Sequence, residues 1–166
     1  SLASLSHAKK EAEILRMASR GRGRFGTLVK SSAPPIEASR GMPADQVAAI
    51  AKTVSARDQV IVWDGVAGAG KTWALKEVRQ NASKGGYKVV ALAPDASSAS
   101  VLGNQLGTSS STVHSFLKSS KKQGRCLLIV DEAGKLSTKL MHDLLKAIDG
   151  TQTRLILSGD HRQLGA

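Results

Sequence analysis

The chain has 166 residues, of which 41% are apolar and only 3% aromatic, so it is long enough for one domain with an aliphatic core. Its formal net charge of +11 favours a polyanionic partner, and nucleic acid is a better candidate than an anionic membrane. The alternative is an ordinary basic protein whose lysines are solvated. No apolar run approaches the roughly 20 residues that span a bilayer, and the first residues lack a signal-peptide core. We therefore expect no membrane insertion and a cytoplasmic location.

One cysteine, Cys126, excludes an internal disulfide and a cysteine-rich metal site. It opens the apolar run CLLIV, so we expect a buried core thiol. The chain begins without methionine and stops at Ala166 without a tail, and we expect it to be a piece of a larger protein.

The first 43 residues are predicted to form a basic helix and a linker. Residues 1–24 read as a charged helix, HAKKEAEILRMASR, followed by GRGRF, and residues 31–43 are rich in Ser, Pro and Gly. Residues 1–40 hold eight Lys and Arg against three Asp and Glu. One interpretation is an arm that contacts phosphates; we favour a linker helix with a solvated face. We predict that residues 44–166 form a separate domain.

From residue 44 onward, helix-like and strand-like segments alternate. The helical segments are 44–54, 71–82, 95–106, 112–120 and 136–150, and the strands are 59–63, 88–94, 126–132 and 153–160. This alternation predicts an α/β fold, a parallel sheet with helices on both faces, and ligand binding beyond the carboxyl ends of the strands.

Two of these helices carry more detailed expectations. The first should bury Val47, Ile50, Ala51 and Val54 on one face. Ser137 should cap the last helix.

A glycine-rich segment between the first strand and the next helix fits the phosphate-loop pattern G-x-x-x-x-G-K-[ST]. Glycines let the backbone turn tightly and point several N–H groups at one anion, and the helix dipole adds positive potential there. We expect Lys71 to contact the β- and γ-phosphates and Thr72 to bind Mg²⁺. The predicted nucleotide-binding residues of this loop are Gly65, Val66, Ala67, Gly68, Ala69, Gly70, Lys71 and Thr72.

Acids and an amide follow two later strands. Asp131 and Glu132 come directly after LLIV, where two adjacent carboxylates would repel each other unless one faces a cation. Asp131 is the expected partner of Mg²⁺, and Glu132 is placed to take a proton from the attacking water. Gln163, three residues after Asp160, can hydrogen-bond the γ-phosphate or that water.

These residues, in order, resemble the motifs of superfamily 1 helicases, close to the RecD-like branch. The resemblance is carried by GVAGAGKT (65–72), ALAPDASSASVL (91–102), TVHSFL (112–117), LLIVDEAGKLS (127–137) and GDHRQLGA (159–166). It implies a P-loop NTPase with a RecA-like sheet that uses ATP and Mg²⁺, with Lys71, Glu132 and Gln163 as catalytic residues.

The same resemblance assigns further contacts. In GMPADQVAAI (41–50), Gln46 matches the glutamine that recognises adenine, while Pro94, Ser97, Thr112 and His114 match positions that contact single-stranded DNA. The preceding EAEILRMASRGRGRFGTLV resembles, more narrowly, the helicase region of conjugative (MobF-class) relaxase–helicases. The implied partners are single-stranded plasmid DNA, a second RecA-like motor domain of the same parent chain and other proteins of the conjugation machinery.

Two residues depart from the family pattern. Asp95 stands where family members usually carry Thr and would repel a DNA phosphate, and Trp73 replaces a small polar residue. The alternatives left open are a non-hydrolysing single-stranded-DNA-binding or docking module, a viral-type superfamily 1 RNA helicase and a small-molecule P-loop kinase. Without a second motor domain and its arginine finger, we expect the isolated piece to be nearly inactive.

Overall fold

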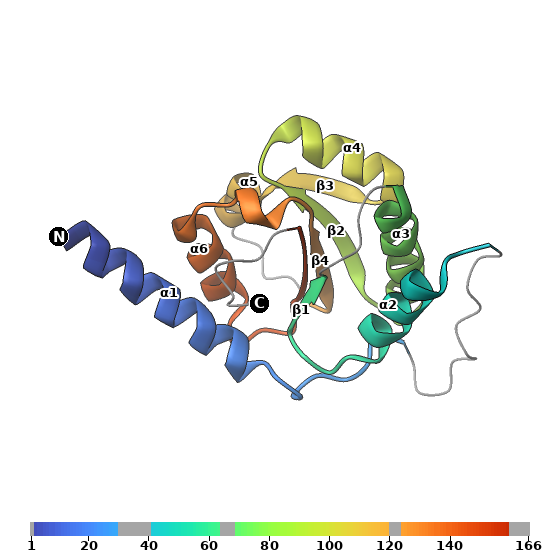
Figure 1. Ribbon diagram of the computed structural model, residues 1–166, viewed down its shortest axis with the longest axis horizontal. Coiled ribbons are helices and arrows are strands. Elements are labelled where there is room, and N and C mark those ends of the chain that lie inside the picture. The colour runs from blue at the N-terminus through green and yellow to red at the C-terminus, as the bar shows by residue number, and fades with distance from the viewer. Residues whose placement is uncertain (1, 30–40, 64–68, 120–123, 160–166) are drawn as a thin grey trace.

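The computed structural model describes residues 2–29, 41–63, 69–119 and 124–159, and it arranges them around one parallel sheet with helices on both faces (Figure 1). The order of its five strands is β1-β5-β4-β2-β3, and every neighbouring pair is parallel. The strands are β1 Val60–Trp63, β2 Lys88–Ala93, β3 Ser109–Thr112, β4 Cys126–Val130 and β5 Arg154–Ser158. The predicted α/β class is confirmed.

Six α-helices and one 3₁₀ turn connect and cover the strands among the described residues. They are α1 Leu2–Arg20, α2 Ala44–Ser55, α3 Ala69–Lys84, α4 Ala96–Leu106, α5 Val113–Lys118, the 3₁₀ turn η1 Ala133–Lys135 and α6 Thr138–Ile148. As predicted, Ser137 caps α6: its hydroxyl accepts the Leu140 N–H at 3.1 Å. None of the described helices is long and apolar enough to cross a membrane.

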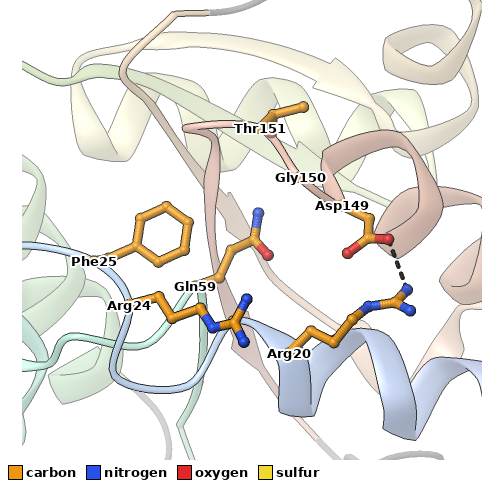
Figure 2. Close-up of a pocket in the computed structure, with 8 residues that line it drawn as sticks. Arg20, Arg24, Phe25, Gln59, Asp149, Gly150 and Thr151 are labelled. Carbon is orange, nitrogen blue, oxygen red and sulfur yellow. Dashed lines mark hydrogen bonds and ion pairs between the residues drawn. The ribbon is translucent and has the colours of Figure 1, made fainter.

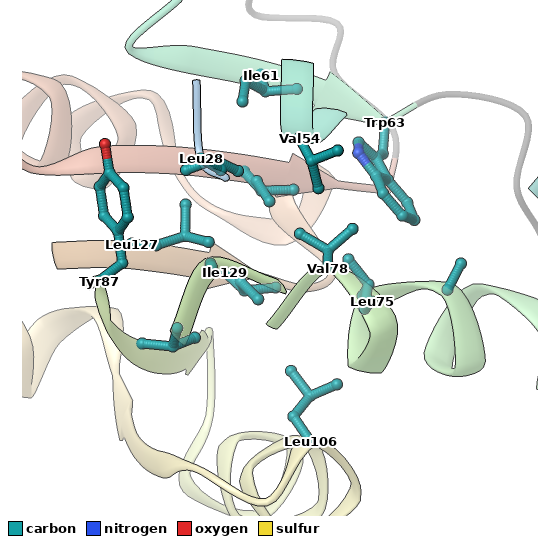
Figure 3. Close-up of a cluster of buried hydrophobic side chains, with 14 of the residues drawn as sticks. Leu28, Val54, Ile61, Trp63, Leu75, Val78, Tyr87, Leu106, Leu127 and Ile129 are labelled. Atoms are coloured by element: carbon teal, nitrogen blue, oxygen red, sulfur yellow. The ribbon is translucent and has the colours of Figure 1, made fainter. Parts of the chain in front are cut away.

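The core has two layers because successive strand residues point to opposite faces of the sheet. In β4, Leu127 and Ile129 face the layer under α2, α3 and α4, which Figure 3 shows in part. Leu128 and Val130 face the layer under α1, α5 and α6. All five residues of β4 are buried, as expected for a central parallel strand. Cys126 is one of them, so the expected core thiol is confirmed.

The N-terminal helix packs on the body of the protein through its second half. Ile14 and Met17 of α1 are buried in the layer that α6 covers. Arg20 donates to Asp149 at 2.7 Å, and Glu13 contacts His142 of α6. The interpretation of α1 as a linker helix was therefore incomplete, since one side of it belongs to the core, while Leu2 and Leu5 in its first turns stay exposed.

A buried arginine fixes the segment that follows α1. Arg154 begins β5 and is fully buried, and its guanidinium donates to the carbonyl oxygens of Gly26, Ala56 and Asp58. It also lies over the Phe25 ring, 5.3 Å from the centroid. A strand residue of the central sheet therefore holds both the N-terminal segment and the turn between α2 and β1.

Two local expectations differ from the structure. Residues 109–111, predicted as neither helix nor strand, belong to the strand β3, which pairs only with β2 within the described part of the chain. In α2, Ala51 is exposed, whereas Gln46 and Thr53 are buried. The buried Thr53 hydroxyl accepts a hydrogen bond from the Trp63 indole nitrogen at 2.7 Å, and this bond joins α2 to the end of β1.

Candidate functional site

The candidate site lies at the carboxyl edge of the sheet, where the ends of β1, β5 and β4 lie next to one another. β1 leads into α3, whose first turn carries Gly70, Lys71 and Thr72. β4 ends at Val130, so Asp131 and Glu132 leave the sheet two strands away from β1. Parallel strands bring their carboxyl ends to one edge, which explains how residues 60 positions apart meet.

The central contact of the site joins Lys71 and Asp131. The lysine Nζ donates to Asp131 Oδ1 at 2.6 Å, and both side chains are partly buried, 21% and 23% exposed. The Asp131 carboxylate is fixed from a second side, because the same oxygen accepts the Glu132 N–H at 2.9 Å. The backbone N–H of Asp131 donates to the Leu92 carbonyl of β2 at 3.0 Å, so the sheet itself positions this acid.

Glu132 has an unusual backbone conformation. Its φ of 55° lies in the left-handed region, which a residue with a side chain adopts at a cost. One carboxylate oxygen, Oε1, accepts from Lys135 Nζ at 3.0 Å; the other, Oε2, is buried without a hydrogen-bond partner among the described residues. The hydrogen bond to Glu132 raises the pKa of Lys135. A strained acid with one unused buried oxygen can accept a proton or a hydrogen bond from a bound molecule.

Gly159, the residue directly after β5, lies against the backbone of this acid. Gly159 has a φ of 116°, and a Cβ there would lie 3.2 Å from the backbone nitrogen of Ala133 and 3.4 Å from the Glu132 Cα. A side chain at position 159 would therefore press on the backbone of the acid pair.

Gln46 lies against the start of α3. Its side chain is 9% exposed, and a Cβ added to Gly70 would overlap the Gln46 amide nitrogen. The Gln46 Oε1 is buried and has no hydrogen-bond partner among the described residues. A buried amide oxygen without a partner is costly, and such a group is a candidate for ligand contact. The glycine at position 70 is thus required by the close approach of Gln46 as well as by the phosphate-loop pattern.

The expected DNA-contacting residues lie at or just after the carboxyl ends of β2 and β3, which are neighbours with Ala93 opposite Thr112. Pro94 is half-buried, Ser97 is exposed in the first turn of α4, and His114 is exposed in the first turn of α5. Thr112 caps α5, with its hydroxyl accepting the Ser115 N–H at 3.0 Å. The structure brings these four residues to the carboxyl edge on the β2–β3 side of the acid pair.

Asp95 has a local role that the sequence reading missed. It caps α4: its carboxylate accepts the Ser98 N–H at 2.8 Å and the Ser98 hydroxyl at 2.9 Å. These bonds, with smaller help from Lys135, lower the pKa of Asp95. The signal was present in the sequence, because Asp before an alanine- and serine-rich helix is a favoured N-cap.

The oxygen donors at this edge suit Mg²⁺. The described residues hold no group of three or more His, Cys, Asp or Glu that could enclose a metal. Mg²⁺ does not need such a group, since it is usually held by one or two protein oxygens together with substrate phosphates and water. The Thr72 hydroxyl and the Asp131 carboxylate are ligands of that kind.

A separate cavity lies at the opposite edge of the sheet, near the amino ends of β1 and β5 (Figure 2). Its volume is about 490 Å³, and its walls include Arg24, Phe25 and Gln59 together with the Arg20–Asp149 ion pair. It is built by the N-terminal segment together with Gln59 and residues 149–151, and it has no part in the candidate site. Gly65, Val66, Ala67, Gly68 and Gln163, which the sequence assigns to the site, lie outside the described residues.

Comparison with known proteins agrees with this geometry. The model of the AAA domain family matches residues 41–166. The chain is 32% identical to the ATP-dependent RecD2 DNA helicase of Deinococcus radiodurans over 141 residues, which are 80% of this chain and 19% of the relative. It is 32% identical to the conjugal transfer protein TraA of Agrobacterium fabrum over 106 residues, 60% of this chain and 10% of the relative.

The UvsW helicase of bacteriophage T4 has the same fold. Its crystal structure aligns with a TM-score of 0.57 at 13% identity, over 82% of this chain and 57% of that one. Of the RecD2 and TraA relatives named above, the chain spans only a tenth to a fifth of the length. By its sequence match and its parallel sheet, the chain belongs to the AAA domain family, as a P-loop domain similar to RecD2 helicases and TraA conjugal transfer proteins.

Proposed function

We propose that the chain is the nucleotide-binding first motor domain of an ATP-dependent DNA helicase or translocase. The observation that carries this proposal is the 2.6 Å contact between Lys71 and Asp131. It joins the lysine of the phosphate-loop pattern to the acid that follows a buried strand 60 residues later, the two groups that a triphosphate and its cation require together. The RecD2 and TraA relatives support the helicase class.

The proposed chemistry divides the work between these side chains. The residues from Gly65 to Thr72 hold the phosphates by backbone N–H groups, and Lys71 exchanges its contact with Asp131 for one with the β- and γ-phosphates. Thr72 and Asp131 would hold Mg²⁺, which neutralises charge on the phosphates when bound. Glu132 accepts a proton from the attacking water, and Gln163 contacts the γ-phosphate or that water.

Single-stranded DNA is the proposed polymer, lying across Pro94, Ser97, Thr112 and His114. The exposure of Ser97 and His114 in the first turns of α4 and α5 supports this placement, because both side chains are accessible to a polymer on the β2–β3 side of the acid pair. The hydrogen bonds from Ser98 lower the pKa of Asp95, so its carboxylate stays charged beside this path and should weaken the binding of DNA phosphates.

The larger context is also a proposal. We infer a conjugative relaxase–helicase parent in the cytoplasm, with a basic segment 1–43 before the motor unit 44–166, a second motor domain and other conjugation proteins as partners. Because that second half would supply the arginine finger, worth about 10³–10⁵ in rate, the chain alone should hydrolyse ATP very slowly. Helicase-like steady-state turnover by this chain would contradict that expectation.

Two matched variants test the proposal. Lys71→Ala should abolish binding of MgATP, whereas Glu132→Gln should bind MgATP like the wild type and lose the slow hydrolysis that we expect of the wild type in single-turnover assays with single-stranded DNA. If Lys71→Ala leaves both ATP and DNA binding unchanged, the docking-module alternative is favoured. Competition between single-stranded DNA and RNA of one sequence separates the DNA helicase from the RNA helicase alternative.

A further inference from the structure

A basic surface lies at the amino edge of the sheet, opposite the proposed nucleotide site. Two cavities open there, of about 490 and 290 Å³, and their walls share Arg20 and Asp149. The charged residues that line them are four exposed cations, Arg16, Arg20, Arg24 and Lys146, and two acids, Glu13 and Asp149. Positive charge therefore exceeds negative charge on what we call the amino-edge surface.

The acids of the amino-edge surface already have partners, whereas two of its cations have none. Asp149 accepts from Arg20 at 2.7 Å, and Glu13 contacts His142. The side chains of Arg24 and Lys146 make no hydrogen bond or ion pair with any other described residue. Exposed cations without a neighbouring acid attract external anions, above all polyanions that contact several of them at once.

The larger cavity has features that phosphates alone would not require (Figure 2). Gln59 in its wall is only 4% exposed, and its amide nitrogen donates to the Ile148 and Thr153 carbonyls at 2.7 and 2.9 Å. These bonds fix the amide and leave Oε1 as an acceptor without a hydrogen-bond partner among the described residues. A Cβ at Gly21 would lie 3.0 Å from this oxygen, so glycine leaves it uncovered. Phe25, which is half-buried, adds an aromatic ring to the same wall.

We infer that the amino-edge surface binds a single strand of nucleic acid. The phosphates contact Arg16, Arg24 and Lys146, and one base enters the larger cavity. There the base meets the Phe25 ring and donates a hydrogen bond to Gln59 Oε1, for which every base has an N–H or amino group. The cavity volume of about 490 Å³ lies within the range of about 300–1,000 Å³ that is usual for small-molecule sites.

Two other polyanions fit this surface less well. The bases of a duplex are paired and stacked, so none of them enters the cavity without being flipped out. An anionic membrane is bound by apolar side chains that project among cations, whereas Phe25 lies in the wall of a hollow. The inferred contact is also separate from the path across Ser97 and His114, which lies at the carboxyl edge of the sheet.

The test is a fluorescence anisotropy titration of the whole chain with a labelled single-stranded DNA at several salt concentrations. The double variant Arg24→Ala/Lys146→Ala should weaken binding about tenfold at low salt. The slope of log affinity against log salt should become shallower by about 1.4, since each phosphate contact to a single strand contributes about 0.7.

The matched control is Lys52→Ala/Lys76→Ala, which removes the same charge. Both lysines are exposed, and they lie on α2 and α3, which cover the other face of the sheet from α1 and α6. This control should change the affinity less than about twofold. Circular dichroism and melting curves check that all variants are folded.

The base contact has a readout of its own. Phe25→Leu should weaken single-strand binding about fivefold and leave the salt slope unchanged, because a ring contact releases no counterions. A duplex of the same sequence should bind the wild type more weakly than the single strand. Unchanged affinity in Phe25→Leu, or a duplex that binds more tightly, overturns the placement of a base in the cavity.

Equal affinities of the two double variants overturn the inference as a whole. Sedimentation of the wild type with phosphatidylserine vesicles, without binding of the single strand, overturns it in favour of a membrane contact. Arg24→Ala/Lys146→Ala should bind MgATP like the wild type, so a failure of this inference leaves the proposed nucleotide site intact.

Discussion

Replacing Arg154 with methionine should lower the melting temperature of the chain by about 6–12 °C. The guanidinium is fully buried and makes four hydrogen bonds to three backbone carbonyl oxygens, those of Gly26, Ala56 and Asp58. Methionine fills the volume of the aliphatic stem but donates no hydrogen bond. The N-terminal segment and the turn before β1 therefore lose their shared anchor on β5.

The magnitude follows from two opposing terms. Each carbonyl left without a donor costs about 1–3 kcal/mol if it stays buried, so three of them cost about 3–9 kcal/mol. Removing a buried charge relieves part of its desolvation penalty, and water can reach some of the carbonyls. We expect a net loss of about 3 kcal/mol, and at about 2–4 °C per kcal/mol for a chain of this size the melting temperature changes as stated.

The assay is thermal unfolding followed by far-ultraviolet circular dichroism. Arg57→Met is the matched control, because Arg57 also donates to this segment, to the Phe25 carbonyl at 3.0 Å, but is exposed. The control should melt within about 2 °C of the wild type, since exposed substitutions usually change stability little. If Arg154→Met melts as high as Arg57→Met, the anchoring argument is wrong.

Three further predictions concern single side chains. Asp95→Thr should keep the α4 cap and bind single-stranded DNA more tightly in a fluorescence anisotropy titration, whereas Asp95→Ala should lower the melting temperature; weaker DNA binding by Asp95→Thr would contradict this. The hydrogen bond from His142 lowers the pKa of Glu13 below its ordinary 4.5, so this pair stabilises the fold above about pH 4.5 and the contribution is lost as pH falls through the lowered pKa. The stability difference between wild type and Glu13→Gln should therefore shrink in melts below pH 4.5, and a constant difference would refute it. Burial raises the pKa of Cys126 to about 11, so a thiol reagent at pH 8 should label it only after denaturation; rapid labelling of the folded chain would show that the thiol is accessible.

Much of the fold could be predicted because its signals are local. The buried strand β4 is a continuous apolar run, and α3 follows the glycine-rich segment and ends at Lys84, two residues before Gly86, whose φ of 91° suits glycine. The order of the strands was not predicted, because it depends on contacts between segments far apart in the chain. That order explains why Lys71 reaches Asp131 across the end of β5.

The missed features carry weak local signals. β3 consists of serines and a threonine, and as an edge strand it needs no apolar run, so only its register with β2 defines it. The burial of Arg154 opposes the usual exposure of arginine and depends on carbonyls that three distant segments supply. The contact of Gln46 with Gly70 likewise depends on the packing of α2 on α3, although the sequence already marked both residues as site candidates.

The most direct test of the central claim is an amide NMR titration of the folded chain with Mg²⁺ and a non-hydrolysable ATP analogue at millimolar concentrations. The account predicts shifts of the Gly70, Lys71 and Thr72 amides on binding, together with the Asp131 amide as its carboxylate loses the lysine contact. Lys71→Ala should abolish these shifts. If the four amides of the wild type do not move, Lys71 and Asp131 form a structural ion pair and the proposed nucleotide site is wrong.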